Sequence, residues 1–503
     1  MARALKLDWT GPRDFRVRPM PVSDVTPAGW KALGDLLAGQ SLTLMGLWAE
    51  APGMAMALYN PETRKVAVAR VKARRGAVPS IGAAHPPAQR LERAASDLGG
   101  LTIDGSPDNR PWLDHGCWDI AHPLAGQTPH PDQPAYPVLP VEGESLHQVA
   151  VGPIHAGIIE PGHFRFTAQG ETVVRLEERF GYTHKGIERL MQGADLSRGA
   201  ELAGRVSGDS AVAYAWAFAQ AAEAAGHVSV PERAFYLRGI MAELERLANH
   251  LGDIGAVCND AAFAMMPAQT SVLREEVLRA AKACFGHRYM RDLIVPGGVA
   301  GDLDSAGDAT LRALLERIRG RFPALVKLYD NNASLLDRTV GTGHLAPALA
   351  GKFGAGGYVG RASGRDFDTR RDLCHAPYDM LHFEVAQRSD GDVNARIWLR
   401  ILEVEQCLSL LTQMLNSLPP GPVRADMPEP AEPCTGLGLV EGFRGDILVW
   451  LSLDAGGRIA RCHLRDPSWF QWPLLEAAIE GNIIADFPLC NKSFNCSYSG
   501  PDL

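Results

Sequence analysis

Apolar side chains recur at helical spacing along two long segments of the chain. After Pro231-Glu232, a favoured opening for a helix, the first segment carries apolar residues at steps of three and four: Ile240, Leu244, Leu247, Leu251 and Ile254. The second segment follows two candidate caps, Asp392 and Asn394, and carries Ile397, Ile401, Val404, Leu408, Leu411 and Leu415. This period places each set on one helix face. We therefore predict two long helices that build the core and carry no chemistry.

Shorter runs with other patterns predict the elements around these helices. Stretches rich in β-forming residues predict strands over 42–48, 65–71, 446–453 and 458–464. Two further runs, 163–167 and 172–176, flank Gln169-Gly170 and predict a hairpin. Helices are predicted over 30–37 and over 91–98, the second ending at Gly99-Gly100, and a terminal helix and tail follow residue 464.

Proline and glycine divide the chain. Residues 121–140 contain six prolines, which favour extended chain and predict a linker. Residues 349–364 contain six glycines and predict a flexible or tight-turning loop without a phosphate-binding pattern, and 417–435 predict a long connection. We expect an α+β fold: a small mixed α/β domain over 1–120, a Pro-rich linker over 121–150, and a mainly α-helical domain with a small β-sheet region over 151–503.

Composition restricts the function classes. The chain has 503 residues, 46% of them hydrophobic, and a net charge of −8, which is typical of a globular protein and argues against a nucleic-acid partner. Its longest uncharged helical stretch, 210–222, is too short to span a membrane, and the first fifteen residues lack the apolar core of a signal peptide. Nine scattered cysteines without a C-x-x-C pair predict reduced thiols. We expect a soluble protein that reaches a membrane only through partners.

Several motifs resemble a known family. The run V-G-P-I-H-A-G-I-I-E-P-G-H-F-R over 151–165 resembles the opening of energy-converting nickel-iron hydrogenase large subunits and of the complex I D subunit, and the resemblance continues through 181–188, 230–233, 243–250, 296–298 and 391–396. Residues 92–108 resemble the complex I C-subunit signature, with Ala94 where Glu is usual and Ser106 where His is usual. A fusion of these two parts resembles formate hydrogenlyase large subunits.

The metal ligands of that family are missing. In a nickel-iron hydrogenase, two C-x-x-C pairs hold the metals as thiolates, because soft sulfur donors suit low-valent nickel and iron. The first pair falls here on Ser207 and Ser210, and the second on Cys496 and Ser499. A neutral hydroxyl does not replace a thiolate. We predict no nickel-iron centre, no hydrogen activation and no cofactor bound by this chain. The two serines are also expected to cap a helix over 211–222, a local role that does not compete with the loss of the ligands.

Other polar residues could line the vacated cavity. His155 and His163 match loop histidines of the complex I quinone site, but the position of its tyrosine falls on Leu196, which has no phenolic donor. Arg205, Asp209 and Glu160 complete the predicted lining. A carboxylate there could relay protons, or it could simply pair with an arginine.

The C-terminal part of the sequence argues against a metal site elsewhere. The spacing of Cys490 and Cys496 is unlike that of zinc motifs, and His463 is expected on a strand. Trp469, Trp472 and Tyr498 are interpreted as packing residues.

The resemblance implies a subunit of a membrane-associated, complex I-like redox complex, peripheral on the cytoplasmic face of the inner membrane. It implies as partners a small iron–sulfur subunit, which holds the clusters, and a membrane arm with antiporter-like subunits. Two functions remain open: coupling of electron transfer to the membrane arm, or a catalytically silent scaffold or conformational coupler. A third, an active hydrogenase, requires an unusual ligand set that includes another cysteine such as Cys490.

Overall fold

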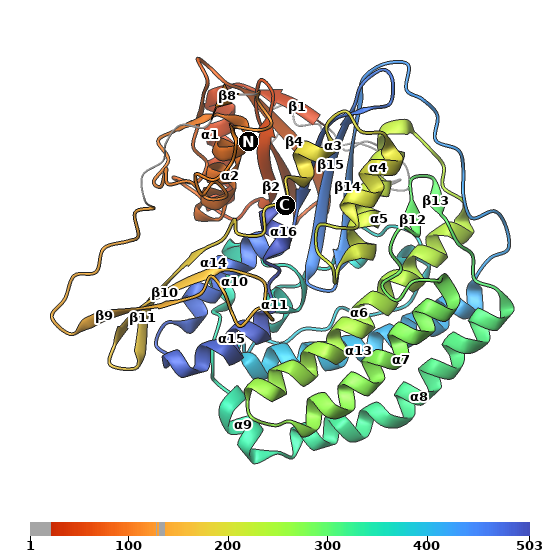
Figure 1. Cartoon of the computed structure of the whole chain (residues 1–503). Helices are drawn as coiled ribbons and strands as arrows, with labels where there is room; N and C mark the ends of the chain where they lie inside the picture. The colour runs from red at the N-terminus through yellow and green to blue at the C-terminus, as the bar shows by residue number, and fades with distance from the viewer. Residues whose placement is uncertain (1–21, 127, 130–135) are drawn as a thin grey trace.

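The computed structural model describes residues 22–126, 128–129 and 136–503 (Figure 1). The first fifteen residues, whose sequence argued against a signal peptide, lie outside the described residues, as do Pro131 and Pro134 of the predicted linker. The described chain forms an N-terminal α/β unit, a projecting three-stranded sheet, a large helical body and a C-terminal sheet with short helices. The expected α+β fold is confirmed.

The N-terminal unit is built on a four-stranded sheet with the order β1-β4-β3-β2, in which β1 runs parallel to β4. Helix α2 packs against β2 and ends at Gly100, whose φ of 66° suits a left-handed cap. The predicted helices and strands of this part are all present. The elements are β1 Val22–Val25, α1 Pro27–Ala38, β2 Thr43–Glu50, β3 Gly53–Asn60, β4 Lys65–Lys72, β5 Ala77–Pro79, α2 Gln89–Gly99 and β6 Thr102–Asp104.

The predicted hairpin is part of an antiparallel sheet with the order β11-β10-β9, which extends to the left in Figure 1. Gly170 makes the turn with a φ of 59°, as the Gln-Gly pair predicted. Two short strands precede this sheet. The bounds are β7 Ile120–Ala121, β8 Thr128–Pro129, β9 Leu146–Val151, β10 His163–Gln169 and β11 Thr172–Arg179.

The helical body contains both predicted core helices, α6 (Glu232–Asp260) and α13 (Val393–Ser417), side by side in Figure 1. Asp392 caps α13 by accepting from the N–H of Ala395 at 2.7 Å. Asn394 is not a cap, because its side-chain oxygen accepts from the hydroxyl of Tyr329. The other helices are α3 Ile187–Met191, α4 Leu196–Ala203, α5 Ala211–Gly226, α7 Met265–Phe285, α8 Ser305–Asp330 and α9 Ala333–Thr339, with β12 Ile294–Val295 and β13 Gly298–Val299.

The prediction of a flexible or tight-turning loop over 349–364 is corrected, because two short helices occupy most of this segment. The segment forms α10 (Pro347–Lys352) and α11 (Gly357–Ala362), and α11 is buried. Its glycines allow close backbone packing, since a Cβ on Gly357 would lie 2.1 Å from the carbonyl oxygen of Arg444.

A strand was missed at the end of the predicted connection. Strand β14 (Cys434–Gly442) pairs with β15 (Gly445–Leu453), which pairs with β16 (Ile459–Arg465). Gly436 and Gly438 let α5 approach the strand so closely that a Cβ on either would lie 2.0 Å from a helix carbonyl. The remaining helices are α12 Thr369–Asp372, α14 Ser468–Ile479, α15 Phe487–Phe494 and α16 Ser499–Asp502. Within the described residues, no helix is both long enough and apolar enough to cross a membrane.

Candidate functional site

Three segments that are distant in sequence meet beside helix α6. They are the turn between α4 and α5, the β14–β15 hairpin turn at Phe443-Arg444, and residues 495–498 between α15 and α16. Each segment contributes side chains to one polar cluster. We call this cluster the serine–arginine site and define it as Ser207, Asp209, Ser210, Arg444 and Ser497.

A bidentate ion pair forms the centre of the serine–arginine site. Arg444 donates to Asp209 through both terminal nitrogens, at 2.7 and 2.6 Å. Burial alone would raise the pKa of Asp209, but the charge and hydrogen bonds of Arg444 outweigh it and hold that pKa below its ordinary value. The carboxylate is therefore ionised at neutral pH. Of the two roles open to Asp209, the structure shows pairing with an arginine.

Hydroxyl groups surround this ion pair. The Ser207 hydroxyl donates to Asp209 at 2.9 Å and lies 3.0 Å from the hydroxyl of Ser497. Ser210 also donates to Asp209, at 3.3 Å. Ser497 accepts from the N–H of Gly500 at 2.9 Å. The site is thus a hydrogen-bonded network of hard oxygen and nitrogen groups around the Arg444–Asp209 ion pair.

Cys496 and Ser499 do not join the serines as the sequence suggested. The sulfur of Cys496 lies within an apolar cluster, 3.9 Å from the side-chain oxygen of Gln471. The backbone N–H of Ser499 donates to the carboxylate of Glu160 at 3.2 Å. The residue that reaches Ser207 is Ser497, one position after Cys496. The reason is the left-handed turn at Asn495 (φ 45°), which ends α15 and precedes this segment.

The predicted serine caps of α5 are also corrected. Ser210 occupies the N-cap position but makes no capping hydrogen bond. Glu245 of α6 takes that role, because its carboxylate accepts from the N–H groups of Val212 and Ala213 at 2.7 and 3.1 Å. Burial raises the pKa of Glu245 to about 8 against the effect of these donors.

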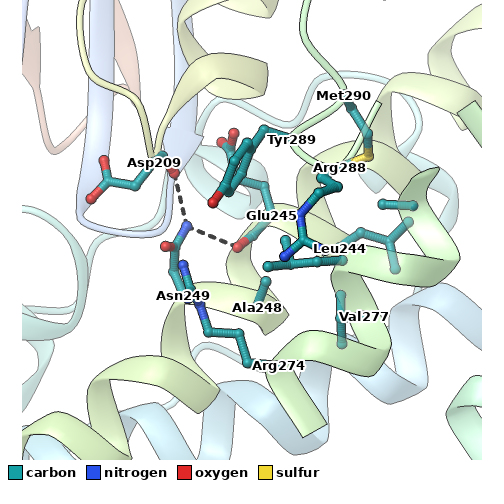
Figure 2. A pocket seen from close by; sticks show the side chains of 12 residues that line it. Asp209, Leu244, Glu245, Ala248, Asn249, Arg274, Val277, Arg288, Tyr289 and Met290 are labelled. Atoms are coloured by element: carbon teal, nitrogen blue, oxygen red, sulfur yellow. Dashed lines mark hydrogen bonds between the residues drawn. The ribbon is translucent and has the colours of Figure 1, made fainter. Parts of the chain in front are cut away.

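A cavity of about 20 Å³ lies beside the site, between α6 and α7. Figure 2 shows Asn249 bridging the backbone oxygens of Asp209 and Glu245, while the Asp209 carboxylate points away from the other lining side chains. A space of this size holds about one water molecule. It is far below the roughly 300 Å³ or more of a typical pocket for an organic ligand.

The other predicted lining residues form their side-chain contacts outside this network. His155 and His163 bond to carbonyls of their own β9–β10 region, at Gly162 and Gly152. Glu160 is exposed and reaches the site region only through the backbone of Ser499. Arg205 is 39% exposed and pairs with Asp292 at 2.5 Å, away from Asp209.

The side chains that a second metal site would use are dispersed. His463 lies on β16, as expected, and bonds to Glu188 at 2.7 Å. Cys490 is buried on α15 near Arg396 and Gly343. Trp469, Trp472 and Tyr498 are buried and pack in the apolar cluster, as interpreted. Among the described residues, no group of three or more His, Cys, Asp or Glu side chains is arranged to hold a metal ion.

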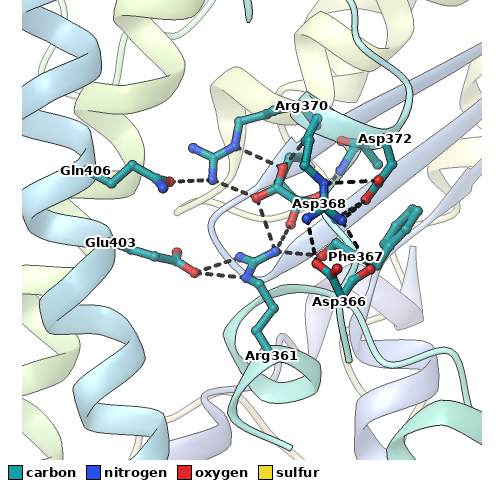
Figure 3. Close-up of polar contacts among 12 residues, drawn as sticks. Arg361, Asp366, Phe367, Asp368, Arg370, Asp372, Glu403 and Gln406 are labelled. Carbon is teal, nitrogen blue, oxygen red and sulfur yellow. Dashed lines mark hydrogen bonds and ion pairs between the residues drawn. The ribbon is translucent and has the colours of Figure 1, made fainter. Parts of the chain in front are cut away.

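A second arginine–carboxylate assembly lies deeper, between α6, α11, α13 and β14. We call it the buried cluster and define it as Glu243, Arg246, Arg361, Asp368, Arg370, Glu403 and Glu441, all at most 2% exposed. Figure 3 shows Arg361 between Glu403 and the loop around Asp368, and Arg370 beside Asp368 and Gln406. Burial and Asp368 raise the pKa of Glu441 to about 7, although Arg361 opposes them.

Sequence reasoning missed Arg444, Ser497 and Glu245. Arg444 is 235 residues from Asp209 and had no motif around it in the sequence. Glu245 follows Glu243 in a stretch that resembled the family, but nothing in the sequence indicated which helix it would cap. No local signal separates Ser497 from Cys496, because Cys496 and Ser499 have the same three-residue spacing as Ser497 and Gly500.

Comparisons with known proteins agree with this architecture. Models of the respiratory-chain NADH dehydrogenase 30 Kd and 49 Kd subunits match residues 32–134 and 260–436. Formate hydrogenlyase subunit 5 of Escherichia coli is 32% identical over 86% of this chain and 78% of its own length. The chain belongs to this family of complex I and hydrogenase subunits. Carbon monoxide-induced hydrogenase of Rhodospirillum rubrum is 30% identical over 70% of the chain and 98% of its own length.

The relatives include subunits of NADH-quinone oxidoreductase as well as of hydrogenases. The D subunit of NADH-quinone oxidoreductase from Dehalococcoides mccartyi is 30% identical over 67% of the chain and 92% of its own length. The fold also matches a chain from the structure of the membrane-bound sulfane sulfur reductase, an archaeal respiratory membrane complex, with a TM-score of 0.68 at 23% identity over 73% of this chain and 100% of that one. The resemblance to a fused C-like and D-like subunit is confirmed.

Proposed function

We propose that this chain is a subunit of a membrane-associated, complex I-like redox complex that works without nickel-iron hydrogen chemistry. The family supports the first part. The observation that carries the second is the guanidinium of Arg444 among the hydroxyls of Ser207, Ser210 and Ser497.

The residues present do not fit a nickel-iron centre. Such a centre needs anionic sulfur ligands, and the serine–arginine site offers neutral hydroxyls, a hard carboxylate and a cation. Burial alone would lower the pKa of Arg444, but Asp209 outweighs it and holds the pKa above its ordinary value, so the cation stays charged. Cys490, the sulfur that an unusual ligand set would need, lies instead beside Arg396.

Within the proposed complex, the chain serves as a scaffold or conformational coupler at this position. The cavity of about 20 Å³ and the fully paired Asp209 support this role over binding of an organic redox molecule. Electrons are proposed to pass through a small iron–sulfur partner, and the chain is proposed to connect that partner to an antiporter-like membrane arm on the cytoplasmic face of the inner membrane.

Metal content and hydrogen turnover of the purified complex test the proposal. We expect no stoichiometric nickel by elemental analysis and no hydrogen-dependent reduction of viologen. Nickel at about one per chain together with hydrogen turnover would contradict the proposal outright, whatever its ligands.

Asp209→Ala tests the scaffold role, with Asp292→Ala as a control because that exposed carboxylate also pairs with an arginine. We expect Asp209→Ala to lower the yield of assembled complex, with unchanged electron transfer per assembled complex. Lost electron transfer in a fully assembled complex would favour a redox role for the site instead.

A further inference from the structure

We propose that a cleft in the N-terminal unit binds a small organic cation, a free amine whose ammonium group pairs with Asp97 of α2. The cleft has a volume of about 300 Å³, which lies at the lower end of the range for ligand pockets and suits a small molecule. Its walls come from residues 93–110 and from His122. The serine–arginine site contributes nothing to it, so the proposal goes beyond the proposed function.

Asp97 is a carboxylate that this cleft leaves without a counter-charge. Its Oδ2 accepts from the backbone N–H groups of Trp112, Leu113 and Asp114 at 2.7, 2.8 and 3.2 Å. Within the described residues, no hydrogen bond reaches its other oxygen, Oδ1, and Asp97 belongs to no ion pair. The three donors hold the side chain in place, so Oδ1 is the oxygen available to a ligand.

The surroundings of Asp97 favour a positive charge in the cleft. Asp97 stands in the last turn of α2, which contains no basic residue, and a helix dipole disfavours a negative charge at the C-terminal end. Burial raises the pKa of Asp97 to about 6 against its three backbone donors, and the charge of Asp114 raises it further. A cation bound in the cleft would offset all three effects.

The arginines around the cleft do not supply that cation. Arg93 and Arg110 pair instead with Asp108, at 3.0 and 2.7 Å. Arg179 interacts electrostatically with Asp97 but forms no ion pair with it in the described part of the chain. The position beside Oδ1 is therefore left to a ligand.

Other groups of the cleft suit the N–H donors of an amine. The Nδ1 of His122 lies 2.9 Å from the carbonyl oxygen of Asp97, which only accepts, so Nδ1 carries the hydrogen and Nε2 of the neutral ring is an acceptor. The His122 ring lies over Gly100, where a Cβ would be 3.1 Å from its Cγ. Ser106 also lines the cleft, with a smaller side chain than the histidine of the C-subunit signature. An ammonium, with three donors and no acceptor, matches this set.

The test uses putrescine (1,4-diaminobutane) as the probe and 1,4-butanediol as its uncharged control of similar shape. Saturation-transfer difference NMR on the purified complex at neutral pH gives the dissociation constants. We expect putrescine to bind and Asp97→Asn to weaken its binding about tenfold, because a hydrogen bond to a charged group is lost. The control Glu62→Gln changes an exposed carboxylate in a turn of the same unit, and we expect less than about a twofold effect.

Three results would overturn the inference: no binding of putrescine, equal binding of 1,4-butanediol, or an affinity for putrescine that Asp97→Asn leaves unchanged. If Asp97→Asn yields no folded subunit, Asn109→Lys replaces it, because Asn109 is an exposed residue of the cleft. Its tethered ammonium should compete and lower putrescine binding about tenfold. Unchanged binding in that variant would equally overturn the inference. None of these outcomes depends on nickel or on hydrogen turnover, which decide the proposed function separately.

Discussion

The serine–arginine site and the buried cluster are both built from arginine and carboxylate, yet they solve different electrostatic problems. In the site, one guanidinium faces one carboxylate that water reaches. In the buried cluster, the guanidiniums of Arg246, Arg361 and Arg370 face four carboxylates, those of Glu243, Asp368, Glu403 and Glu441, all shielded from water. One negative charge is in excess there, and the raised pKa of Glu441 lets a proton neutralise it.

The difference teaches how burial decides the charge state. A matched pair keeps both charges, because each ion has its counter-charge and water also reaches the Asp209 carboxylate. A fully buried group of unequal charges adjusts its protonation instead, since an uncompensated ion in the interior costs several kcal/mol. The stability of the cluster is therefore expected to depend on pH, and the cluster is expected to tolerate loss of an arginine less well than the site does.

The largest contrast should come from removing one arginine from each assembly. Arg361→Met leaves Glu403 and Glu441 buried without their main partner, and we expect a loss of about 3–5 kcal/mol in the free energy of unfolding. Arg444→Met should cost about 1–2 kcal/mol, because Asp209 stays hydrated. Urea unfolding of the purified complex measures both, with the exposed Arg279→Met as a control. Equal losses for the two variants would remove the distinction between the assemblies.

The contribution of Glu245 to the stability of α5 can be separated from that of the serines. Glu245→Ala removes the carboxylate that caps α5, and we expect a loss of about 2 kcal/mol. Ser210→Ala should cost under about 0.5 kcal/mol, because Ser210 makes no capping bond. Thermal unfolding compares them directly. A larger effect of Ser210→Ala would restore the serine as the cap.

A pH series isolates the buried cluster. The folded pKa of Glu441, about 7, lies above its ordinary value of 4.5, so the folded state favours the protonated carboxyl. Its contribution to stability is full below about pH 4.5 and is lost as the pH rises through 7. Glu441→Gln should remove up to about 1.4 kcal/mol per pH unit of this dependence between those limits. Parallel pH profiles for the variant and the wild type would show that protonation of Glu441 does not contribute to the pH dependence of stability.

The smallest effect concerns a single hydroxyl in the site. Ser497→Ala removes the contacts to Ser207 and to the N–H of Gly500, and we expect a loss of about 1 kcal/mol or less. Cys496→Ala, in the neighbouring apolar cluster, is the comparison: it should act through packing alone and leave the site intact. Differential scanning calorimetry of the two variants can resolve this order. A pronounced loss only for Ser497→Ala would show that the hydroxyl network does more than fill space.

Periodic elements could be predicted from the sequence, and contact-dependent ones could not. The stripes of α6 and α13 and the turn at Gly170 are local patterns, and each formed as predicted. Helix α11 was missed because its glycines looked like breakers, and strand β14 follows a segment predicted as a connection and was not assigned. In both elements the glycines permit close backbone contacts, with Arg444 and with α5. Whether a glycine allows such close packing depends on neighbours that are distant in sequence.

The candidate site was predictable only in part, for the same reason. Ser207, Ser210 and Asp209 could be recognised from a local motif. Arg444 and Glu245 act across long sequence separations, where one arginine or glutamate looks like any other. The choice between Cys496 and Ser497 depended on a single left-handed residue, Asn495.

Gly500 also restricts which sequences this fold accepts. A side chain at residue 500 would collide with the carboxylate of Asp466, because a Cβ built there lies 2.3 Å from its Oδ2. A lineage that changed residue 500 would therefore pass through crowded, less stable intermediates. Selection for stability alone would keep a glycine at this position.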